Sequence, residues 1–241
     1  MRIVICLPTY NERANLEPIV RRLGDVLASL DAGARVLVID DSSPDGTGEL
    51  AERLTSELPF LDVLHRMRKE GLGPAYIAGF HRALEHGADR ILQMDCDFSH
   101  DPADVPRLLA AGEGAGLVLG SRYVEGGGTE NWGRGRQAIS RFGSLYARTI
   151  LGVPVHDLTG GFKCWRREAL EALPLDRIRT KGYAFQIETT YRAIRAGFEV
   201  VEIPIVFAER RSGGSKMTRG IVLEAMWKVP ELRLRAALNR L

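Results

Sequence analysis

The chain has 241 residues, of which 45% are hydrophobic and 27% charged, the composition of an ordinary globular protein with a buried core. The 33 basic and 31 acidic residues leave a net charge of +2, which excludes the strongly basic character of a nucleic-acid-binding protein. The three cysteines, Cys6, Cys96 and Cys164, lie far apart in apolar runs and predict neither a disulfide framework nor a zinc site.

Hydropathy predicts a protein of the cytoplasm. No apolar run approaches the roughly 20 residues that a membrane-spanning helix needs. Met1 leads directly into the apolar run 3–7, without the charged, apolar and cleavage regions of a signal peptide.

Short apolar runs alternate with helical patterns from the start of the chain, which is typical of βαβ units and a parallel sheet. In chain order the patterns predict strand 3–7, helix 11–30, strand 35–39, a helix ending near 58, strand 61–64, helix 73–86, a strand ending at Asp95, helix 101–111 and strand 116–119.

The pattern changes after the fifth strand. Residues 123–136 are rich in glycine and poor in aliphatic side chains, which predicts a long loop, and loops of that length are often functional. The remaining patterns predict helix 137–151, strand 160–165, helix 185–196, strand 199–203, the extended segment 206–208, the basic loop 209–216 and a final helix from about 218. No repeat or linker interrupts the chain, so we expect a single α/β domain.

Two carboxylates stand at the end of a buried strand pattern. The run 90–94 continues into Asp95-Cys96-Asp97, which would present hard oxygen ligands at the carboxyl edge of a sheet, where open α/β sheets bind their ligands. Such oxygens suit Mg²⁺ or Mn²⁺, ions that proteins usually share with substrate phosphates. The motif indicates a metal–diphosphate site, although solvated loops and helix caps use the same residues about as often.

Other predicted strands end in polar residues too. These ends are Pro8-Thr9-Tyr10-Asn11-Glu12, Asp40-Asp41 and Ser121-Arg122. Caps and turns explain Asn11 and Asp45 equally well, but they do not explain why carboxylates and an arginine recur at successive strand ends. A sheet edge that holds a base, a ribose and a metal-bound diphosphate needs such a set.

Seven motifs together give the chain a family resemblance. The segments 8–12, 39–47 and 95–97 resemble family 2 glycosyltransferases of the GT-A fold. Further motifs make the chain similar to polyprenyl-phosphate (dolichyl-phosphate) mannose synthases: Gly120-Ser121-Arg122-Tyr123, Asn131-Trp132, Asp157-Leu158-Thr159-Gly160-Gly161-Phe162 and Ser215-Lys216. The resemblance implies a GT-A, Rossmann-like domain over residues 1–219, with a mostly parallel sheet flanked by helices, and a helical tail over 220–241.

The resemblance implies an inverting, metal-dependent transfer of mannose from GDP-mannose to a polyprenyl monophosphate. Position by position, it places around the nucleotide Pro8, Tyr10, Glu12, Ile39 and Asp41. It places Asp95 and Cys96 along the donor and Asp97 on the Mg²⁺ or Mn²⁺ ion, with Asp95 and Ser99 as further metal ligands. Some relatives carry a Gln at the position of Ser99. The serine side chain is shorter than that of Gln, so Ser99 would contact the metal through a water molecule.

The acceptor chemistry can be argued from the substrate. A phosphate monoester has a second pKa near ~6 and is mostly dianionic at pH 7, so it needs cations rather than a general base. Arg122, Arg136 and Ser140 match the family's acceptor-phosphate positions, and arginine's planar fork suits that task. Arg136 and Ser140 are four residues apart near a predicted helix N-terminus, which adds favourable N–H groups. A solvated basic face is the alternative interpretation.

The basic loop before the last helix matches the residues that close over the donor phosphates. These are Arg210 and Lys216, which with the metal would stabilise the leaving diphosphate. Gly213 and Gly214 would let the loop fold over the donor, although a surface turn explains them equally well. Glu188 is expected to have a structural or orienting role.

The tail 220–241 mixes apolar residues with Lys228, Arg233, Arg235 and Arg240. An interfacial amphipathic helix would have this composition, but packing on the domain explains it at least as well. Pro230 is expected to kink or split the helix. Since the implied acceptor is a lipid, we expect peripheral association with the cytoplasmic face of the membrane, and a separate membrane-anchoring subunit is a candidate partner.

Two alternatives remain at this stage. The first is transfer of glucose or an N-acetylhexosamine from a UDP-sugar to the same lipid phosphate, because the few contacts near Ile39 and Asp41 do not determine the nucleotide. The second is a catalytically inactive subunit that binds nucleotide sugars. The intact set of Asp95, Asp97 and Arg122 with the loop cations argues against the second.

Overall fold

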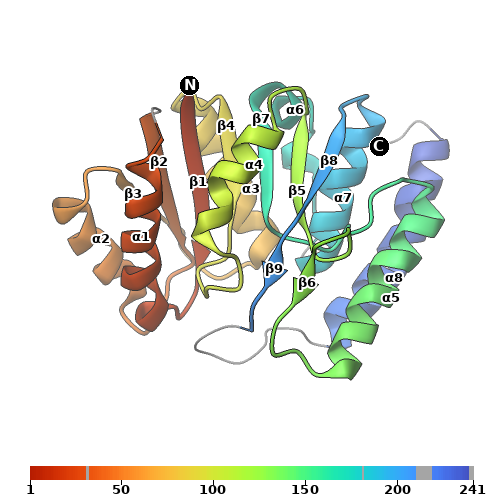
Figure 1. Ribbon diagram of the computed structural model, residues 1–241, viewed down its shortest axis with the longest axis horizontal. Coiled ribbons are helices and arrows are strands. Elements are labelled where there is room, and N and C mark those ends of the chain that lie inside the picture. Colours follow the sequence, from red (N-terminus) through yellow and green to blue (C-terminus); the bar gives the residue numbers. More distant parts are fainter. Residues whose placement is uncertain (31–32, 181, 210–218, 239–241) are drawn as a thin grey trace.

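The computed structural model describes residues 1–30, 33–180, 182–209 and 219–238, with the backbone alone for 219–225. A seven-stranded sheet forms the centre of the molecule, with strand order β3-β2-β1-β4-β7-β5-β8 (Figure 1). Its strands are β1 (Arg2–Thr9), β2 (Gly33–Asp40), β3 (Leu61–His65), β4 (Arg90–Gln93), β5 (Leu117–Ser121), β7 (Lys163–Arg166) and β8 (Val200–Pro204). All neighbouring pairs are parallel except those of β7, which is antiparallel to both β4 and β5.

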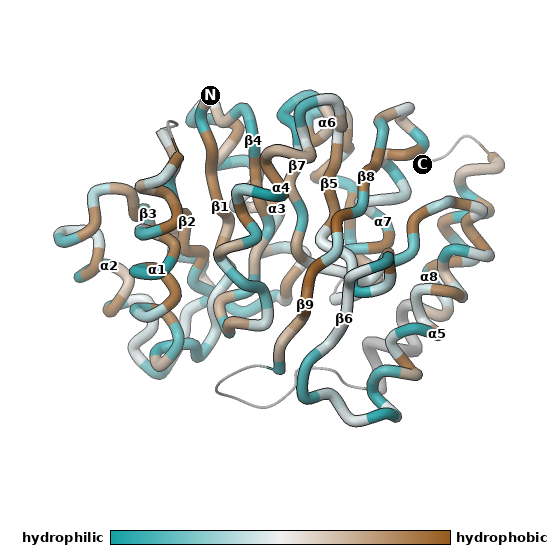
Figure 2. Tube along the Cα trace, viewed as in Figure 1, coloured by the Kyte–Doolittle hydropathy of each residue, from teal (hydrophilic) through white to brown (hydrophobic). Residues whose placement is uncertain are grey.

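Helices cover both faces of the sheet (Figure 1). They are α1 (Arg13–Leu27), α2 (Thr47–Glu57), α3 (Leu72–Glu85), α4 (Val105–Ala111), α5 (Arg134–Leu151), α6 (Arg167–Glu171), α7 (Gly182–Arg195) and α8 (Arg219–Ala237), with 3₁₀ turns η1 (Pro102–Asp104) and η2 (Leu175–Arg177). The central strands are nearly continuous apolar runs (Figure 2), as a sheet buried on both faces requires.

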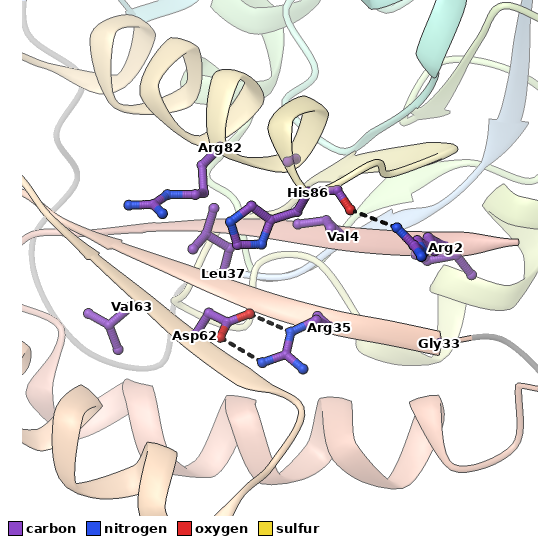
Figure 3. Close-up of a pocket in the computed structure, with 11 residues that line it drawn as sticks. Arg2, Val4, Gly33, Arg35, Leu37, Asp62, Val63, Arg82 and His86 are labelled. Atoms are coloured by element: carbon purple, nitrogen blue, oxygen red, sulfur yellow. Dashed lines mark hydrogen bonds and ion pairs between the residues drawn. The ribbon is translucent and has the colours of Figure 1, made fainter.

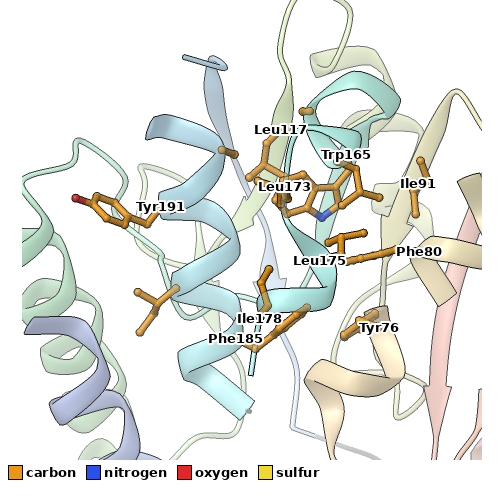
Figure 4. Close-up of a cluster of buried hydrophobic side chains, with 14 of the residues drawn as sticks. Tyr76, Phe80, Ile91, Leu117, Trp165, Leu173, Leu175, Ile178, Phe185 and Tyr191 are labelled. Carbon is orange, nitrogen blue, oxygen red and sulfur yellow. The ribbon is translucent and has the colours of Figure 1, made fainter. Parts of the chain in front are cut away.

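Each face of the sheet has its own hydrophobic cluster. One cluster lies between the sheet and α1, α2 and α4, and it includes Leu16, Leu54 and Leu108. The other lies between the sheet and α3, α6 and α7, where large aromatic side chains fill the space around Trp165 (Figure 4). The rings of Tyr76 and Phe185 stack there, with centroids 6.1 Å apart. The fold is therefore a three-layer sandwich.

The order in which the chain adds strands to the sheet reverses between β1 and β4. From β1 the chain first adds β2 and β3 on one side, and then β4 on the other. In open α/β sheets such a switch point lies at the crevice where ligands bind, outside the carboxyl ends of the strands. Because β1 is parallel to both β2 and β4, the polar residues that follow these three strands lie at the same edge of the sheet.

The structure confirms the expected fold class, a mostly parallel α/β sheet flanked by helices, and it corrects local details. The segment 123–136 contains the short strand β6 (Gly128–Thr129), parallel to β9 (Val206–Phe207), and α5 already begins at Arg134. The low helix propensity of Gly135 conceals that first turn in the sequence. Helix α8 runs through Pro230 without a break, contrary to expectation. Among the described residues, no helix is both long and apolar enough to cross a membrane.

Candidate active site

The carboxyl ends of β1 and β2 bring the predicted nucleotide residues together. In their register Pro8 faces Ile39 and Thr9 faces Asp40, and the amide of Asp41 donates to the Thr9 carbonyl at 3.1 Å. Tyr10 and Asp41 therefore leave neighbouring strands at the same level. The predicted residues of this group therefore lie together at the carboxyl edge of the sheet, at the switch point.

Asp41 has a cationic neighbour that the motifs did not indicate. The Arg66 guanidinium, from the loop after β3, contacts the Asp41 carboxylate and donates to Glu70 at 2.7 Å. Burial raises the pKa of Asp41, and the Arg66 charge opposes that rise. In the same loop, Lys69 Nζ lies 3.8 Å from the centroid of the Tyr10 ring. The sequence feature that could have indicated these two cations is the basic run 66–69, which directly follows a predicted strand.

Glu12 ties the turn after β1 to the turn after β2. It precedes the first residue of α1, and its carboxylate accepts a hydrogen bond from Asn15 Nδ2 at 2.8 Å. Its amide donates to Thr47 Oγ1 at 3.0 Å, and Asp45 accepts from the amide and the hydroxyl of Thr47. The Asp45-Gly46-Thr47 turn is thus a structural support for the segment after β1.

The loop after β4 holds its two carboxylates in a tight turn. Asp97 and Ser99 are buried, and the Ser99 amide donates to Asp97 Oδ1 at 3.0 Å. Phe98 between them has a φ of 62°, the left-handed conformation that such a turn requires. Tyr76 donates to Asp95 Oδ1 at 3.5 Å. Cys96 belongs to the hydrophobic cluster on the α1 face of the sheet. Its side chain is therefore buried, and only its backbone could contact a bound donor.

His100 closes this loop. Its Nδ1 accepts a hydrogen bond from the Asp95 amide at 3.0 Å, and its ring stacks on Phe162 with centroids 4.7 Å apart. Burial lowers the pKa of His100, which keeps the imidazole neutral and Nδ1 an acceptor. His100 is therefore a positioning residue for the carboxylate loop.

The carboxylates fit a divalent cation that is shared with a substrate. Within the described residues, no group of three or more His, Cys, Asp or Glu side chains is arranged to hold a metal ion. Asp95 and Asp97, with Ser99, could contribute oxygen ligands from one strand end. Mg²⁺ and Mn²⁺ sites that use one or two carboxylates are completed by phosphate oxygens and water. The residues are therefore suited to a metal–diphosphate complex.

Arg122 forms a buried ion pair at the end of β5. Its Nε and Nη2 donate to the two carboxylate oxygens of Asp157, each at 2.7 Å, and Nη2 also donates to Thr159 at 2.8 Å. Burial raises the pKa of the Asp157 carboxyl, but the Arg122 charge and hydrogen bonds outweigh it, so the pKa is lowered. Glu202 of β8 accepts from the amides of His156 and Asp157, at 2.7 and 2.9 Å, and holds the loop in place.

An aromatic cluster surrounds the predicted acceptor residues. The Arg136 guanidinium lies 3.9 Å from the centroid of the Trp132 ring, and the Tyr123 hydroxyl donates to Ser140 at 2.6 Å. Arg122 lies 5.7 Å from the Trp132 ring. The structure therefore gathers Arg122, Arg136 and Ser140 as the sequence predicts.

Two donors in this cluster are buried without a hydrogen-bond partner among the described residues. They are Trp132 Nε1 and Arg136 Nε. An unpaired buried donor costs about 1–3 kcal/mol, so such groups in native proteins call for an explanation. A bound anion between the two residues would supply the missing acceptors.

Phe207 of β9 joins the carboxylate loop to the arginine cluster. Its ring contacts His100, with centroids 5.2 Å apart, and Trp132, with centroids 5.3 Å apart. Burial raises the pKa of Tyr183 in α7, and the charges of Arg122 and Arg136 oppose that rise. Neither aromatic residue was predicted, since each stands alone in the sequence without a motif.

Comparison with known proteins identifies the family. The family model for glycosyl transferase family 2 matches residues 4–173. The chain is 48% identical over 236 residues to an undecaprenyl-phosphate mannosyltransferase of Micrococcus luteus, covering 98% of this chain and 96% of that one. This chain belongs to glycosyl transferase family 2. It is therefore a glycosyltransferase.

Two further relatives of this family 2 enzyme are mannose synthases by name. A polyprenol monophosphomannose synthase of Mycolicibacterium smegmatis is 46% identical, over 99% of this chain and 89% of that one. A dolichol-phosphate mannosyltransferase of Pyrococcus furiosus is 35% identical, over 93% of this chain and 61% of that one.

Solved structures confirm the fold. Glucosyl-3-phosphoglycerate synthase of Mycobacterium tuberculosis, crystallised with Mn²⁺, UDP-glucose and phosphoglyceric acid, aligns with a TM-score of 0.67. The alignment covers 95% of this chain and 79% of that one at 20% identity. The likeness concerns the GT-A-like arrangement of sheet and helices.

The remaining predictions concern the loop before α8 and Glu188. Arg210 and Lys216, with Gly213 and Gly214, lie outside the described residues, so their closure over the donor stays a prediction. Glu188 accepts hydrogen bonds from Thr180 at 2.7 Å and Arg192 at 2.8 Å, as a structural residue would.

A pocket of about 370 Å³ lies at the opposite edge of the sheet (Figure 3). It is lined by the first residues of β1 and β2 and the end of α3, among them Arg2, Arg35 and Arg82. Arg35 forms a bidentate ion pair with Asp62, at 2.5 and 2.6 Å. None of the predicted site residues lines this pocket, so it is separate from the active site.

Proposed function

We propose that this enzyme transfers mannose from GDP-mannose to a polyprenyl monophosphate, with inversion at the anomeric carbon. The observation that carries the proposal is the junction at Phe207, where the carboxylate loop 95–100 meets the cluster of Arg122, Trp132 and Arg136. A donor diphosphate needs the first group and an acceptor phosphate needs the second. The names of the three relatives support the sugar and the lipid class.

Pro8, Tyr10, Glu12, Ile39 and Asp41 are proposed to bind the nucleotide, with Asp95 and Cys96 along the sugar diphosphate. Arg66 and Lys69 add positive charge beside this group. Asp97, with Asp95 and Ser99, would hold Mg²⁺ or Mn²⁺, which when bound would neutralise charge on the departing diphosphate. Arg210 and Lys216 are proposed to assist from the loop before α8.

In the proposed reaction, an acceptor phosphate oxygen attacks the anomeric carbon as the bond from that carbon to the GDP oxygen breaks. The electron pair of that bond leaves with GDP, and the product is a mannosyl phosphodiester. Since the attacking oxygen is already anionic near pH 7, the site needs no general base. Arg136, Ser140 and Trp132 would bind the acceptor phosphate, and Arg122 would stay fixed on Asp157 beside them.

The proposal includes a place in the cell and a division of the chain. Since the acceptor is a lipid, we place the enzyme at the cytoplasmic face of the membrane. Residues 1–219 would form the catalytic domain, and 220–241 the helical tail. A separate membrane-anchoring subunit stays a prediction.

A donor-selection assay tests the proposal. The purified full chain is incubated with Mn²⁺, detergent-dispersed polyprenyl phosphate and, in separate reactions, labelled GDP-mannose, UDP-glucose or UDP-N-acetylglucosamine. Label from GDP-mannose in the organic extract is the expected result, and polyprenol without phosphate is the matched control. Label from a UDP-sugar would overturn the donor. Metal-dependent donor binding without label in any extract would instead favour the inactive-subunit alternative.

A further inference from the structure

Three buried side chains from different elements form a line of hydrogen bonds. The Trp165 indole Nε1 donates to Gln93 Oε1 at 2.6 Å, and Gln93 Nε2 donates to Gln186 Oε1 at 3.3 Å. Trp165 belongs to β7 and to the aromatic cluster of Figure 4, and Gln186 belongs to α7. Gln93 is the last residue of β4, two residues before Asp95. The Trp165–Gln93–Gln186 line therefore runs past the start of the carboxylate loop.

The indole fixes the orientation of both amide groups. An indole nitrogen donates and cannot accept, so the Gln93 atom that faces it must be the oxygen. The nitrogen of Gln93 then faces Gln186, and the atom of Gln186 that receives it must again be the oxygen. Gln186 Nε2 is therefore the far end of the line, and its two N–H groups point away from Gln93.

The line ends in a donor without an acceptor. Gln186 is 2% exposed, and its Nε2 is buried with no hydrogen-bond partner among the described residues. Buried polar groups in native proteins are nearly always paired, so an orphan donor calls for an explanation. The turn of α7 that carries it is also held in place, because Lys163 Nζ of β7 donates to the Gln186 carbonyl at 2.8 Å. A bound ligand oxygen would supply the missing acceptor.

The orphan nitrogen adjoins both halves of the candidate site. A Cβ atom added to Gly161 would lie 3.4 Å from Gln186 Nε2 and 3.7 Å from His100 Cε1. His100 holds the amide of Asp95 in the carboxylate loop. Gly161 follows the segment in which Thr159 accepts from Arg122. The free N–H groups therefore lie beside the loop proposed for the donor and beside the segment that leads to the acceptor cluster.

The chemistry of this place favours a hydroxyl group over a phosphate. An amide N–H is a neutral donor, whereas phosphate is bound most strongly by charged donors. Two cations on the adjoining elements are already engaged. Arg122 donates to Asp157 and Thr159, and Lys163 Nζ donates to three oxygens of α7, at 2.8, 3.3 and 3.0 Å. A hexose whose diphosphate lies at the carboxylate loop would present hydroxyl oxygens, which accept from a neutral N–H.

We propose that Gln186 Nε2 donates a hydrogen bond to a hydroxyl oxygen of the transferred hexose, and that Trp165 and Gln93 orient it for this contact. Gln186 is then a specificity-determining residue, and Trp165 and Gln93 are positioning residues. The inference rests on the proposed function only for the identity of the hexose, because any sugar nucleotide presents such hydroxyl groups.

Calorimetric titration with matched ligand pairs tests the contact. In the presence of Mn²⁺, the full chain is titrated with GDP-mannose and GDP, and separately with UDP-glucose and UDP. Gln186→Met keeps the length of the side chain and removes the donor. It should bind GDP-mannose about 3- to 10-fold more weakly and GDP as tightly as wild type does, because only the sugar loses a hydrogen bond.

The matched control is Thr189→Val, which removes another buried polar group of α7 that contacts Lys163. It should leave the affinities for GDP-mannose and GDP unchanged. Thermal unfolding checks that both variants fold.

The monodeoxy analogues of GDP-mannose identify the hydroxyl and test the orienting residues. Wild type should bind one analogue about 3- to 10-fold more weakly than GDP-mannose, and Gln186→Met should not distinguish the two ligands. Gln93→Glu should also lose this distinction while it keeps its affinity for GDP. The introduced carboxylate accepts from both neighbours, so the Gln186 amide would turn and donate to it rather than to the sugar. A purely structural role of Gln93 would leave the distinction intact.

Three outcomes would overturn the inference. They are unchanged affinity of Gln186→Met for both sugar nucleotides, an equal fall for each sugar nucleotide and its diphosphate, and a raised KM for polyprenyl phosphate alone. The last would assign the N–H groups to the acceptor phosphate.

Failure of the proposed function has a different signature. A selective fall seen with UDP-glucose, in a protein that does not bind GDP-mannose, would refute the proposed donor and support the role of Gln186. Mannose transfer from GDP-mannose, with sugar-nucleotide binding unaffected by Gln186→Met, would support the function and refute the inference.

Discussion

Arg122 and Arg136 lie near the same indole ring but are held very differently. Arg122 is buried and forms a bidentate pair with Asp157. Arg136 contacts half-exposed Glu209 at 3.4 Å and stacks on Trp132. In the proposed reaction, the positive charge offered to the acceptor phosphate therefore comes chiefly from Arg136, while Arg122 fixes the shape of the site.

The unpaired indole N–H predicts a role for Trp132 in acceptor binding. Trp132→Phe keeps an aromatic ring against Arg136 but removes the donor. Since a hydrogen bond to a charged group contributes about 1.5–3 kcal/mol, kcat/KM for polyprenyl phosphate should fall roughly 10- to 100-fold with an unchanged KM for GDP-mannose. Steady-state kinetics in detergent measures both constants. Trp227→Phe is the matched control, and an equal rise in both KM values would contradict the assignment.

Asp97 should be essential for the metal-dependent step. Asp97→Asn preserves the size of the side chain but removes the charge, so turnover should fall at least about 100-fold and Mn²⁺-dependent GDP-mannose binding should be lost. Calorimetric titration with and without EDTA measures the binding. Asp101→Asn makes the same change in the same loop and should be nearly silent. Undiminished turnover of Asp97→Asn in EDTA would refute the metal assignment.

The loop between α5 and β7 links the acceptor cluster to the sheet. Glu202 of β8 holds the amides of His156 and Asp157, and Asp157 in turn holds Arg122 at the end of β5. The position of one arginine therefore depends on three separate elements, which a local sequence pattern does not report.

Breaking the buried pair should destabilise the protein. Asp157→Asn leaves the Arg122 charge buried and unpaired, so the free energy of unfolding should fall by about 3–5 kcal/mol. Urea denaturation at pH 7 measures it. Asp62→Asn breaks the half-exposed pair with Arg35 and should cost about 1 kcal/mol or less. Similar losses in the two variants would show that burial does not set the strength of the Arg122–Asp157 pair.

The Arg122–Asp157 pair also makes the free energy of unfolding depend on pH in the acid range. Because the folded pKa of Asp157 is lowered, its stabilisation is fully present above the ordinary carboxyl pKa of about 3.9 and is lost as the pH falls through the folded value. The unfolding free energy of Asp157→Asn should therefore vary less with pH below about 4 than that of wild type.

At the scale of the whole molecule, one arrangement brings the two proposed substrate sites together. The reversal of strand order beside β1 places the donor motifs at one point of the sheet edge. Strand β9 carries Phe207 from the far side of the sheet to that point, and α5 carries the acceptor residues there.

The sequence alone determined the layered α/β fold, and it predicted which residues lie together at the candidate site. Continuous apolar runs specify strands buried on both faces, and carboxyl ends of parallel strands meet at one edge. Pro8, Asp41 and Asp97 could therefore be placed at one edge of the sheet from the strand pattern, and Ile39 followed from the family motifs. Arg122, Arg136 and Ser140 followed from the family motifs, and the structure brings them together.

Only the tertiary structure decided the features that depend on contacts between distant segments. The antiparallel insertion of β7, the Arg66–Asp41 contact and the stacking of Arg136 on Trp132 join residues that no local period relates. The outward apolar side of α5, which includes exposed Phe142, is a further case. Periodicity shows that a helix has two different faces, but which face is buried depends on the shape of the neighbours it packs against. Here Ser144, Ala147 and Leu151 fit against the domain.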